Sequence, residues 1–264
     1  MSPQEPSESE QQWRKALTQG EAVPRFMRHL FAVLPASPRC KMCNAPFKGI
    51  GAPLMRLIGR RQSAKNPTYC EPCVFDEPGG AEVEISMVFA DVRGSTTIAE
   101  QLQPGDYTRL IQRFYEQATR TFVRYDALID RLMGDGVIAL FVPSFAGRQH
   151  ARQAILAAQE LRHRLGHDDP AGPWLPVGIG VNTGIAFVGV VQGGPEGLTD
   201  FTVLGDNVNV TARLASAAAA GEILVSDAAY DAARLELGSL EHRDLDLKGK
   251  SQPVGAHVIS SGRP

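Results

Sequence analysis

The sequence has 264 residues, 43% of them hydrophobic, which is enough for one sizeable core and a smaller appendage. Its formal net charge of -2 argues against a general nucleic-acid-binding protein, because such proteins usually carry a basic excess. The polar N-terminus, MSPQEPSESEQQ, lacks an export-signal pattern, and no segment reaches the roughly 18 apolar residues of a spanning helix. A cytoplasmic protein without a transmembrane segment is therefore expected.

The first part of the chain divides into a tail and a small module. Residues 1–10 are rich in Glu, Ser and Pro, and we expect them to form a disordered tail. Residues 11–75 begin with two short amphipathic helices between Gln11 and Leu34, interrupted by Gly20 and Pro24. Their apolar faces need a neighbouring segment to pack against.

All four cysteines fall in two CxxC pairs, which are Cys40 with Cys43 and Cys70 with Cys73. Such pairs can place four thiolates around one tetrahedral ion, and a short segment without its own core gains its fold from that ion. Structural zinc is the expected occupant. Iron-sulfur ligation uses the same thiolates and stays an alternative, as does a redox-sensing dithiol. The module is expected to be structural or to bind a protein partner.

A turn-rich segment near residues 76–82 separates this module from a second domain, residues 83–260. The elements predicted there are strand 84–90, helices 96–103 and 107–124, strands 127–132 and 137–142, helix 148–165, a hairpin of strands 174–181 and 185–191 around Asn182-Thr183-Gly184, strand 201–204, a helix capped by Asp206 and ending near 216, strand 222–225, helix 226–234 and two late strands. This is an α+β fold of ferredoxin-like βαββαβ order with C-terminal additions.

Two carboxylates lie where predicted strands end. The apolar run ISMVFA ends in Asp91 and is followed by Gly94, Ser95 and Thr96, where a helix begins. The turn MGDG places Asp135 at a hairpin tip. Carboxylates on adjacent strand ends beside a helix N-terminus can bind divalent cations and the phosphates that accompany them.

Five motifs in order, FADVRGST, MGDGVIALF, VGIGVNTG, TVLGDNVNVTARL and LKGKSQPV, make residues 84–258 resemble the catalytic domain of class III nucleotide cyclases. The resemblance implies conversion of ATP to 3',5'-cyclic AMP and pyrophosphate with two Mg²⁺ or Mn²⁺ ions. The segment from Cys40 to Cys73 also resembles a cysteine-rich preface found in some bacterial members.

The resemblance assigns roles to particular residues. The metal ligands it implies are Asp91, the carbonyl of Val92, and Asp135; the phosphate contacts are the backbone of Gly94, Ser95 and Thr96, with Lys248 or Lys250 at the triphosphate. Asn209 and Arg213 lie four residues apart, hence on one helix face, and match the pair that orients the ribose and stabilises the transferred phosphoryl group. In the family this pair comes from the opposite subunit, which implies a homodimer.

The same resemblance implies that Arg131 and Thr202 determine which purine base, adenine or guanine, the site binds. Thr202 matches the adenylate cyclase pattern, whereas Arg131 replaces the usual lysine. Arg131 can donate to adenine N1 and does not offer the acceptor that guanine requires, but a planar guanidinium is not equivalent to an ammonium group. ATP is therefore the expected substrate, with weak activity or a distinct base preference left open.

Two other classes of function fit the sequence less well. A degenerate cyclase homologue that binds nucleotide and regulates a partner is the main alternative, and a zinc-ribbon interaction or nucleic-acid-binding protein is the third. The chain lacks the Gly-Gly-Asp/Glu-Glu-Phe motif of diguanylate cyclases, and Gly178-Ile-Gly180 does not lead into a helix as a dinucleotide site requires. No sensor domain is recognisable, and the sequence does not reveal a regulatory signal or a preference for Mg²⁺ or Mn²⁺.

Overall fold

The structure is a computed structural model that describes residues 7–19, 25–33, 37–74, 78–193, 199–248 and 250–260. The chain forms two compact units. Unit 1 comprises residues 1–83, 143–145 and 187–204, and unit 2 comprises residues 84–142, 146–186 and 205–264. Each unit is described by itself.

Unit 1 contains the N-terminal helices and the cysteine-rich segment. Its helices are α1 (Glu8–Gln19), α2 (Arg25–Ala32), α3 (Ala52–Leu57) and the short 3-10 helix η1 (Glu71–Cys73). α1 begins inside the segment that the sequence assigned to a disordered tail, because Ser7 Oγ accepts a hydrogen bond from the Glu10 backbone N–H at 3.2 Å and caps the first turn. Residues 1–6 of that predicted tail lie outside the described residues.

The strands follow the order β2-β3-β1-β4-β6-β8-β7, with β5 paired to β4. Their bounds are β1 (Gly79–Val92), β2 (Leu128–Met133), β3 (Gly136–Phe141), β4 (Val177–Gln192), β5 (Thr199–Leu204), β6 (Ile223–Ser226), β7 (Glu241–Leu245) and β8 (Val254–Ile259). The first four strands have the ferredoxin-like arrangement, so the predicted α+β fold is confirmed. β4 and β6 are parallel, whereas β6, β8 and β7 continue antiparallel.

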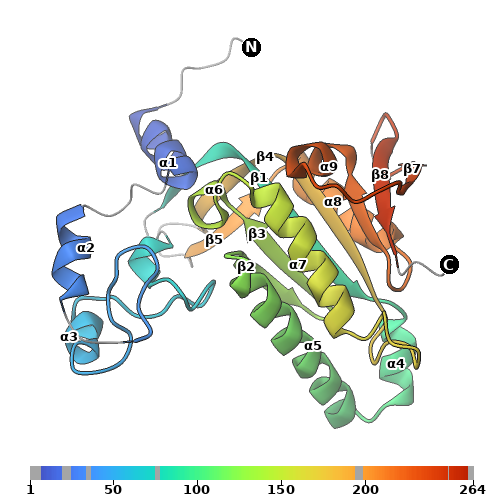
Figure 1. The fold of residues 1–264 in the computed structure, drawn as a ribbon, viewed down its shortest axis with the longest axis horizontal. Helices are drawn as coiled ribbons and strands as arrows, with labels where there is room; N and C mark the ends of the chain where they lie inside the picture. The colour runs from blue at the N-terminus through green and yellow to red at the C-terminus, as the bar shows by residue number, and fades with distance from the viewer. Residues whose placement is uncertain are drawn as a thin grey trace. The chain divides into compact units, whose positions relative to one another are not determined.

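Helices cover both faces of the sheet in unit 2. The helices of this unit, with α6 shared between the units, are α4 (Ser95–Gln101), α5 (Pro104–Arg124), α6 (Pro143–Ala146), α7 (His150–Arg164), α8 (Asp206–Ala217) and α9 (Asp227–Ala233). α5 and α7 lie side by side over β2 and β3, and α9 packs beside α7 (Figure 1). Ile223 and Val225 of β6 point into this core, whereas Leu224 between them packs with Leu214 of α8 on the other face.

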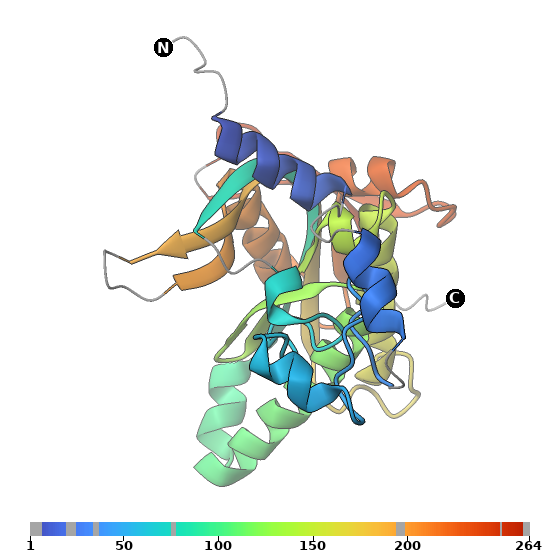
Figure 2. The ribbon, with the colours of Figure 1, turned by 90° about the vertical axis from the view of Figure 1, so that its left-hand side faces the viewer.

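The predicted hairpin around Asn182-Thr183-Gly184 is wrong, because β4 runs without interruption from Val177 to Gln192. The polar side chains that suggested a turn are satisfied inside the sheet. Asn182 Oδ1 accepts from the hydroxyl of Ser226 at 2.7 Å, and Thr183 Oγ1 lies 2.6 Å from Ser86 Oγ. β4 instead forms its hairpin with β5, drawn as two neighbouring orange strands in Figure 2.

The predicted N-cap of α8 is also corrected. Asp206 is the first residue of the helix, and Gly205 precedes it at φ 139°, a conformation that favours glycine. The Asp206 carboxylate pairs with the ammonium group of Lys250 instead of capping the helix. The loop between β7 and β8 is thereby tied to the start of α8.

Candidate active site and four-cysteine centre

Asp91 and Asp135 lie beside each other where β1 meets the hairpin of β2 and β3. Asp91 is the cross-strand partner of Gly136, and the Val92 backbone N–H donates to the carbonyl of Asp135 at 3.0 Å. A β-carbon on Gly136 would lie 3.6 Å from Asp91 Oδ1, so the Asp91 carboxylate lies over this glycine. Both acidic residues therefore lie at the same edge of the sheet. Val92, whose carbonyl is the third predicted metal ligand, directly follows Asp91 in the sequence.

A basic side chain from the same motif faces the two carboxylates. Arg93 pairs with the Asp91 carboxylate and donates to the carbonyl of Ser216 at 2.9 Å. Burial lowers the pKa of the Arg93 guanidinium, and the negative charge of Asp135 opposes that shift. The sequence analysis gave Arg93 no role. The sequence position of Arg93 could have indicated this ion pair, because a long side chain two residues after Asp91 can reach the Asp91 carboxylate.

A hydrogen bond from α5 restrains the turn between β2 and β3. The Tyr115 hydroxyl donates to the carbonyl of Gly134 at 2.7 Å, and Gly134 has φ 56°, which a turn of this kind requires. Burial raises the pKa of Tyr115, and the charges of Asp135 and Tyr107 add to the shift. Tyr115 is thus a neutral donor that fixes the turn before Asp135.

The predicted phosphate-binding segment follows directly on β1. Gly94 has φ 68° and is the residue before α4, while Ser95 and Thr96 form the first two positions of that helix. Open space surrounds the position of a Gly94 β-carbon, so the backbone conformation, and not crowding, favours glycine here. In the sequence, α4 therefore begins shortly after Asp91, at Ser95.

α8 carries Asn209 and Arg213, one turn apart. Asn209 is exposed and Arg213 is half-buried; within the described part of the chain, neither side chain forms a hydrogen bond or an ion pair. α8 packs closely on β4, because a β-carbon on Gly180 would lie 2.4 Å from the backbone nitrogen of Ala215. Asn209 and Arg213 thus lie on a helix that packs closely against the sheet, and the polar groups of both side chains are available to a ligand.

The two candidate base-reading residues lie on different elements. Arg131 is in β2 next to a bulge at Asp130, and its Nε lies 3.5 Å from Asp130 Oδ2. Thr202 is buried in β5, opposite Gly189 of β4. Arg131 belongs to unit 2 and Thr202 to unit 1.

The two candidate lysines differ in their surroundings. Lys250 is half-buried and pairs with Asp206 at the start of α8, whereas Lys248 is exposed. No contact with another side chain holds the Lys248 ammonium group among the described residues. Lys248 is therefore the more available of the two.

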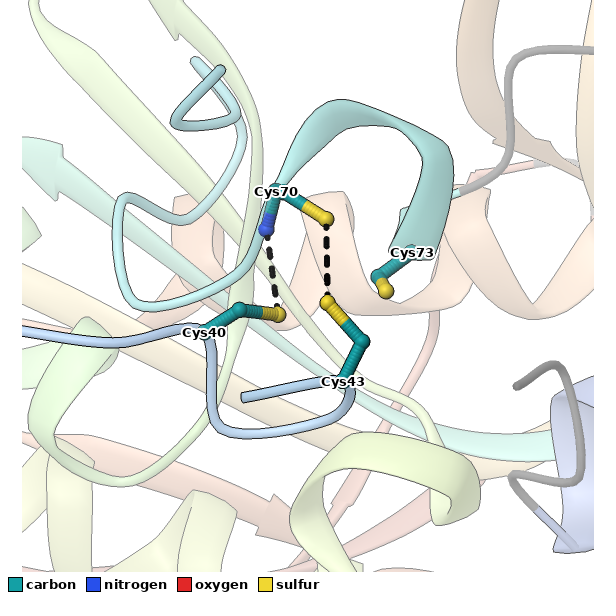
Figure 3. A group of neighbouring side chains, drawn as sticks. All are labelled: Cys40, Cys43, Cys70 and Cys73. Carbon is teal, nitrogen blue, oxygen red and sulfur yellow. Dashed lines mark hydrogen bonds between the residues drawn. The ribbon is translucent and has the colours of Figure 1, made fainter. Parts of the chain in front are cut away.

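The four cysteines of unit 1 come together in space. Cys40, Cys43, Cys70 and Cys73 are buried, and their sulfurs all lie within 4.8 Å of one another (Figure 3). Cys43 Sγ and Cys70 Sγ are 3.6 Å apart, far longer than the roughly 2.05 Å of a disulfide. Bonds of about 2.3 Å to a tetrahedral zinc ion place sulfurs about 3.8 Å apart, so this spacing fits a single ion.

Backbone turns and one arginine support the sulfurs. The Cys70 backbone N–H donates to Cys40 Sγ at 3.4 Å, and Arg60 donates to Cys43 Sγ at 3.3 Å while its guanidinium stacks on Phe31. Hydrogen bonds among the thiols, that of Cys43 first, lower the pKa of Cys40, whereas the hydrogen bonds of Cys70, that with Cys40 first, raise the pKa of Cys70. Deprotonation at this cluster is the condition for metal ligation. Sequence analysis missed Arg60, which lies in a basic run without a distinguishing motif.

The family model for the adenylate and guanylate cyclase catalytic domain matches residues 80–261. Since this is more than half of the chain, the protein belongs to the adenylate and guanylate cyclase family. No helix among the described residues is long and apolar enough to span a membrane.

One of two curated relatives with similar sequences is named as a cyclase. An uncharacterised protein of Mycobacterium tuberculosis is 31% identical over 184 residues, which cover 67% of this chain and 32% of the relative. Adenylate cyclase 1 of Rhizobium meliloti is 30% identical over 136 residues, which cover 50% of this chain and 20% of the relative. The chain thus spans about a third or less of the length of these relatives.

Solved structures with the same fold include cyclases of both base specificities. The guanylyl cyclase Cya2 is 28% identical with a TM-score of 0.62, covering 70% of this chain and 96% of that structure. The adenylyl cyclase CyaB from P. aeruginosa is also 28% identical, with a TM-score of 0.61 and coverage of 70% and 98%. Overall similarity therefore does not distinguish ATP from GTP.

Proposed function

We propose that this chain is an adenylate cyclase that converts ATP to 3',5'-cyclic AMP and pyrophosphate in a homodimer. The observation that carries the proposal is the adjacency of Asp91 and Asp135, joined by the hydrogen bond from Val92 to the Asp135 carbonyl. Two carboxylates and a main-chain carbonyl are the oxygen donors that Mg²⁺ and Mn²⁺ prefer, so the donor set fits two such ions.

In this reaction the ribose 3'-oxygen bonds to the α-phosphorus, loses its proton, and displaces pyrophosphate. Bound divalent ions would lower the pKa of the attacking hydroxyl and neutralise the leaving group. Asp91 and Asp135 would hold the ions, and the N–H groups from Gly94 to Thr96 would orient the phosphates. Arg93 balances the charge of Asp91 in the structure and would have to give up that contact when a cation binds.

Asn209 would orient the ribose, and Arg213 would stabilise the charge that develops on the transferred phosphoryl group. Both side chains are free of competing hydrogen bonds in the described residues, which supports these roles. Of the two lysines, we assign Lys248 to the triphosphate, because Lys250 is already paired with Asp206.

A homodimer would bring Asn209 and Arg213 of one chain to the carboxylates of the other. Exposed apolar side chains beside the carboxylate edge support this proposal. Leu132 and Met133 directly precede the turn that holds Asp135, and their side chains are exposed. Apolar surface of this kind next to a proposed site is suited to a subunit interface.

ATP is proposed over GTP because of Arg131. Its guanidinium can donate to adenine N1, whereas guanine presents N–H donors there and needs an acceptor. The neighbouring Asp130 could be such an acceptor, but its side chain is only 4% exposed and faces Arg131. Thr202 on β5 offers a hydroxyl that can both donate and accept.

For the cysteine cluster we propose one structural zinc ion. The spacing of the sulfurs supports a single ion over a cluster of several irons, which would hold the thiolates further apart. Because the segment 37–74 has few regular elements, the ion would contribute much of its folding free energy.

The decisive test is product analysis with ATP and GTP side by side, in Mg²⁺ and in Mn²⁺. We expect cyclic AMP from wild type and a loss of at least about 100-fold in Asp91→Asn, since metal stabilisation is worth several kcal/mol and 1.36 kcal/mol is tenfold. Asp231→Asn on the exposed surface of α9 is the matched control and should keep full activity. A dimer that binds ATP yet yields no cyclic nucleotide would instead establish the degenerate, regulatory alternative.

A further inference from the structure

A second cluster of metal-ligating side chains lies away from the carboxylate edge, within unit 2. Asp227 begins α9, His242 is in β7 and His257 is in β8. One potential ligand atom from each lies within 4.8 Å of the others. We propose that these three residues bind a divalent transition-metal ion of the Zn²⁺ type, independently of the cyclase site.

The distances match those between two ligands of one ion. His242 Nε2 lies 3.0 Å from Asp227 Oδ1, and His257 Nε2 lies 3.3 Å from the same oxygen. With metal bonds of about 2.0–2.1 Å, adjacent ligand atoms are about 3.0 Å apart in octahedral geometry and about 3.4 Å in tetrahedral geometry. Both histidines also present the same ring nitrogen to the carboxylate, as ligands of a shared ion do.

The sheet register and a glycine create the space for this arrangement. His242 and His257 are direct cross-strand partners, so their rings project from the same face. Gly255 leaves room for the carboxylate, because a β-carbon there would lie 2.1 Å from Asp227 Oδ2 and 2.9 Å from His242 Nε2. Tyr230 of α9 stacks on the His257 ring with centroids 3.8 Å apart and fixes its orientation.

The chemistry selects the ion. Two imidazoles are borderline donors that suit Zn²⁺, Co²⁺ or Ni²⁺ and suit Mg²⁺ poorly, and one carboxylate oxygen is a common third ligand of Zn²⁺. The side chains of Asp227 and His242 are 50% and 43% exposed, so an ion can enter from solvent and keep water at its remaining positions. Each imidazole would bind the ion through the lone pair of a neutral Nε2 and carry its proton on Nδ1.

Bound metal would join three elements, the two strands of the β7 and β8 hairpin and α9. The loop of that hairpin carries Lys248 and Lys250, and Lys250 pairs with Asp206 at the start of α8. The site would therefore restrain the hairpin whose loop contacts the helix that bears Asn209 and Arg213.

The test is calorimetric titration of Zn²⁺ into the full chain whose four-cysteine centre is already loaded with one equivalent, at pH 7.5 in excess Mg²⁺. The Mg²⁺ occupies oxygen-rich sites and competes poorly for imidazole. We expect one further equivalent of Zn²⁺ to bind. Its affinity should fall about 10-fold or more in His242→Ala and in Asp227→Asn, since even outer-shell changes cost about 10–100-fold.

His163→Ala is the matched control, because His163 also faces a carboxylate, that of Asp168 at 3.1 Å, but among the described residues this pair is not part of a group of three metal-ligating side chains. This variant should bind the further zinc as wild type does. Because His242 is exposed, its replacement should leave the chain folded, which circular dichroism in chelator checks. Failure of wild type to bind a further equivalent, or equal binding by wild type and His242→Ala, would overturn the proposal whatever the cyclase activity proves to be.

Discussion

The Val92 backbone N–H donates to the carbonyl of Asp135 at 3.0 Å, and this bond holds two sequence-distant acidic residues at one edge of the sheet. The strand register contributes as well, because Asp91 lies directly opposite Gly136, the residue that follows Asp135. The turn is further restrained by the Tyr115 hydroxyl at Gly134. In the proposed metal site, a preorganised pair of carboxylates would avoid the cost of assembling the site when the nucleotide binds.

Mixing two inactive chains should restore cyclase activity if the active site is shared between subunits. With the proposed roles, Asp91→Ala would remove a metal ligand and Arg213→Ala would remove the cation that stabilises the transition state, so each variant alone should be inactive. Random reassociation makes half of the dimers mixed, and each mixed dimer holds one intact site, which gives about a quarter of wild-type activity. Cyclic AMP production is measured after mixing. No recovery despite demonstrated subunit exchange would show that each chain carries its complete site.

Replacing Arg131 should alter base recognition more than turnover chemistry. Arg131→Ala should lower kcat/KM for ATP by about 10–100-fold, because a charged hydrogen bond is worth about 1.5–3 kcal/mol. Arg131→Lys should recover much of this loss and keep the preference for ATP. Arg120→Ala, on α5 outside the proposed site, is the control. Kinetics with ATP and GTP decide the question, and an unchanged ATP:GTP ratio in Arg131→Ala would disprove the assigned role.

Replacing Lys248 and replacing Lys250, the two lysines of the LKGK motif, should have different effects. Lys248→Ala should raise KM for ATP and reduce kcat/KM by about 10-fold or more, since it would remove the proposed charged contact to the triphosphate. Lys250→Ala should act mainly through stability, because Lys250 pairs with Asp206. Steady-state kinetics and thermal unfolding of both variants provide the comparison. The opposite pattern would transfer the phosphate contact to Lys250.

Removing the arginine beside the cysteine cluster should weaken metal retention. Arg60 donates to Cys43 Sγ at 3.3 Å, so it offsets the negative charge of a four-thiolate site. Arg60→Ala should lose zinc about 10–100-fold more readily, in line with other outer-shell contacts. Arg61→Ala is the neighbouring control, because its side chain is exposed. Competition with a coloured chelator measures both, and equal zinc loss from the two variants would exclude the proposed support.

Acidification should destabilise the fold through His150. Burial lowers the pKa of this imidazole, with the charge of Glu84 opposing, and its Nδ1 lies 2.9 Å from Ser86 Oγ. The unfolded chain therefore binds more protons than the folded chain once the pH falls below about 6.5, so stability declines as the pH drops.

Urea unfolding of wild type and His150→Gln at pH 7.5 and 5.5 measures this effect. The variant should lose less stability on acidification, because it has no imidazole to charge on unfolding. His163→Gln, at an exposed position, should behave as wild type does. Acid release of metal from the proposed four-cysteine site would affect all three chains alike, so only the difference in stability loss between them matters. An identical decline in all three would contradict a role for His150.

The sequence by itself determined where the polar residues of the candidate sites lie relative to the ends of strands and helices. Apolar runs that stop at Asp91 and before Asp135, and the spacing of Asn209 and Arg213, are local patterns that follow from period-2 strands and period-3.6 helices. The two CxxC pairs are equally local. These features, with five ordered motifs, were sufficient to recognise the cyclase family and its ferredoxin-like order, and the family match confirms that recognition.

Only the tertiary structure decided which polar residues are turns and which are buried partners. Asn182 and Thr183 read as a hairpin tip, yet bonds to Ser226 and Ser86 keep them inside one long strand. Asp227, His242 and His257 share no sequence motif, and the register of β7 against β8 beside α9 brings them together. Local propensity extends over a few residues, whereas these contacts depend on how strands far apart in the chain are paired.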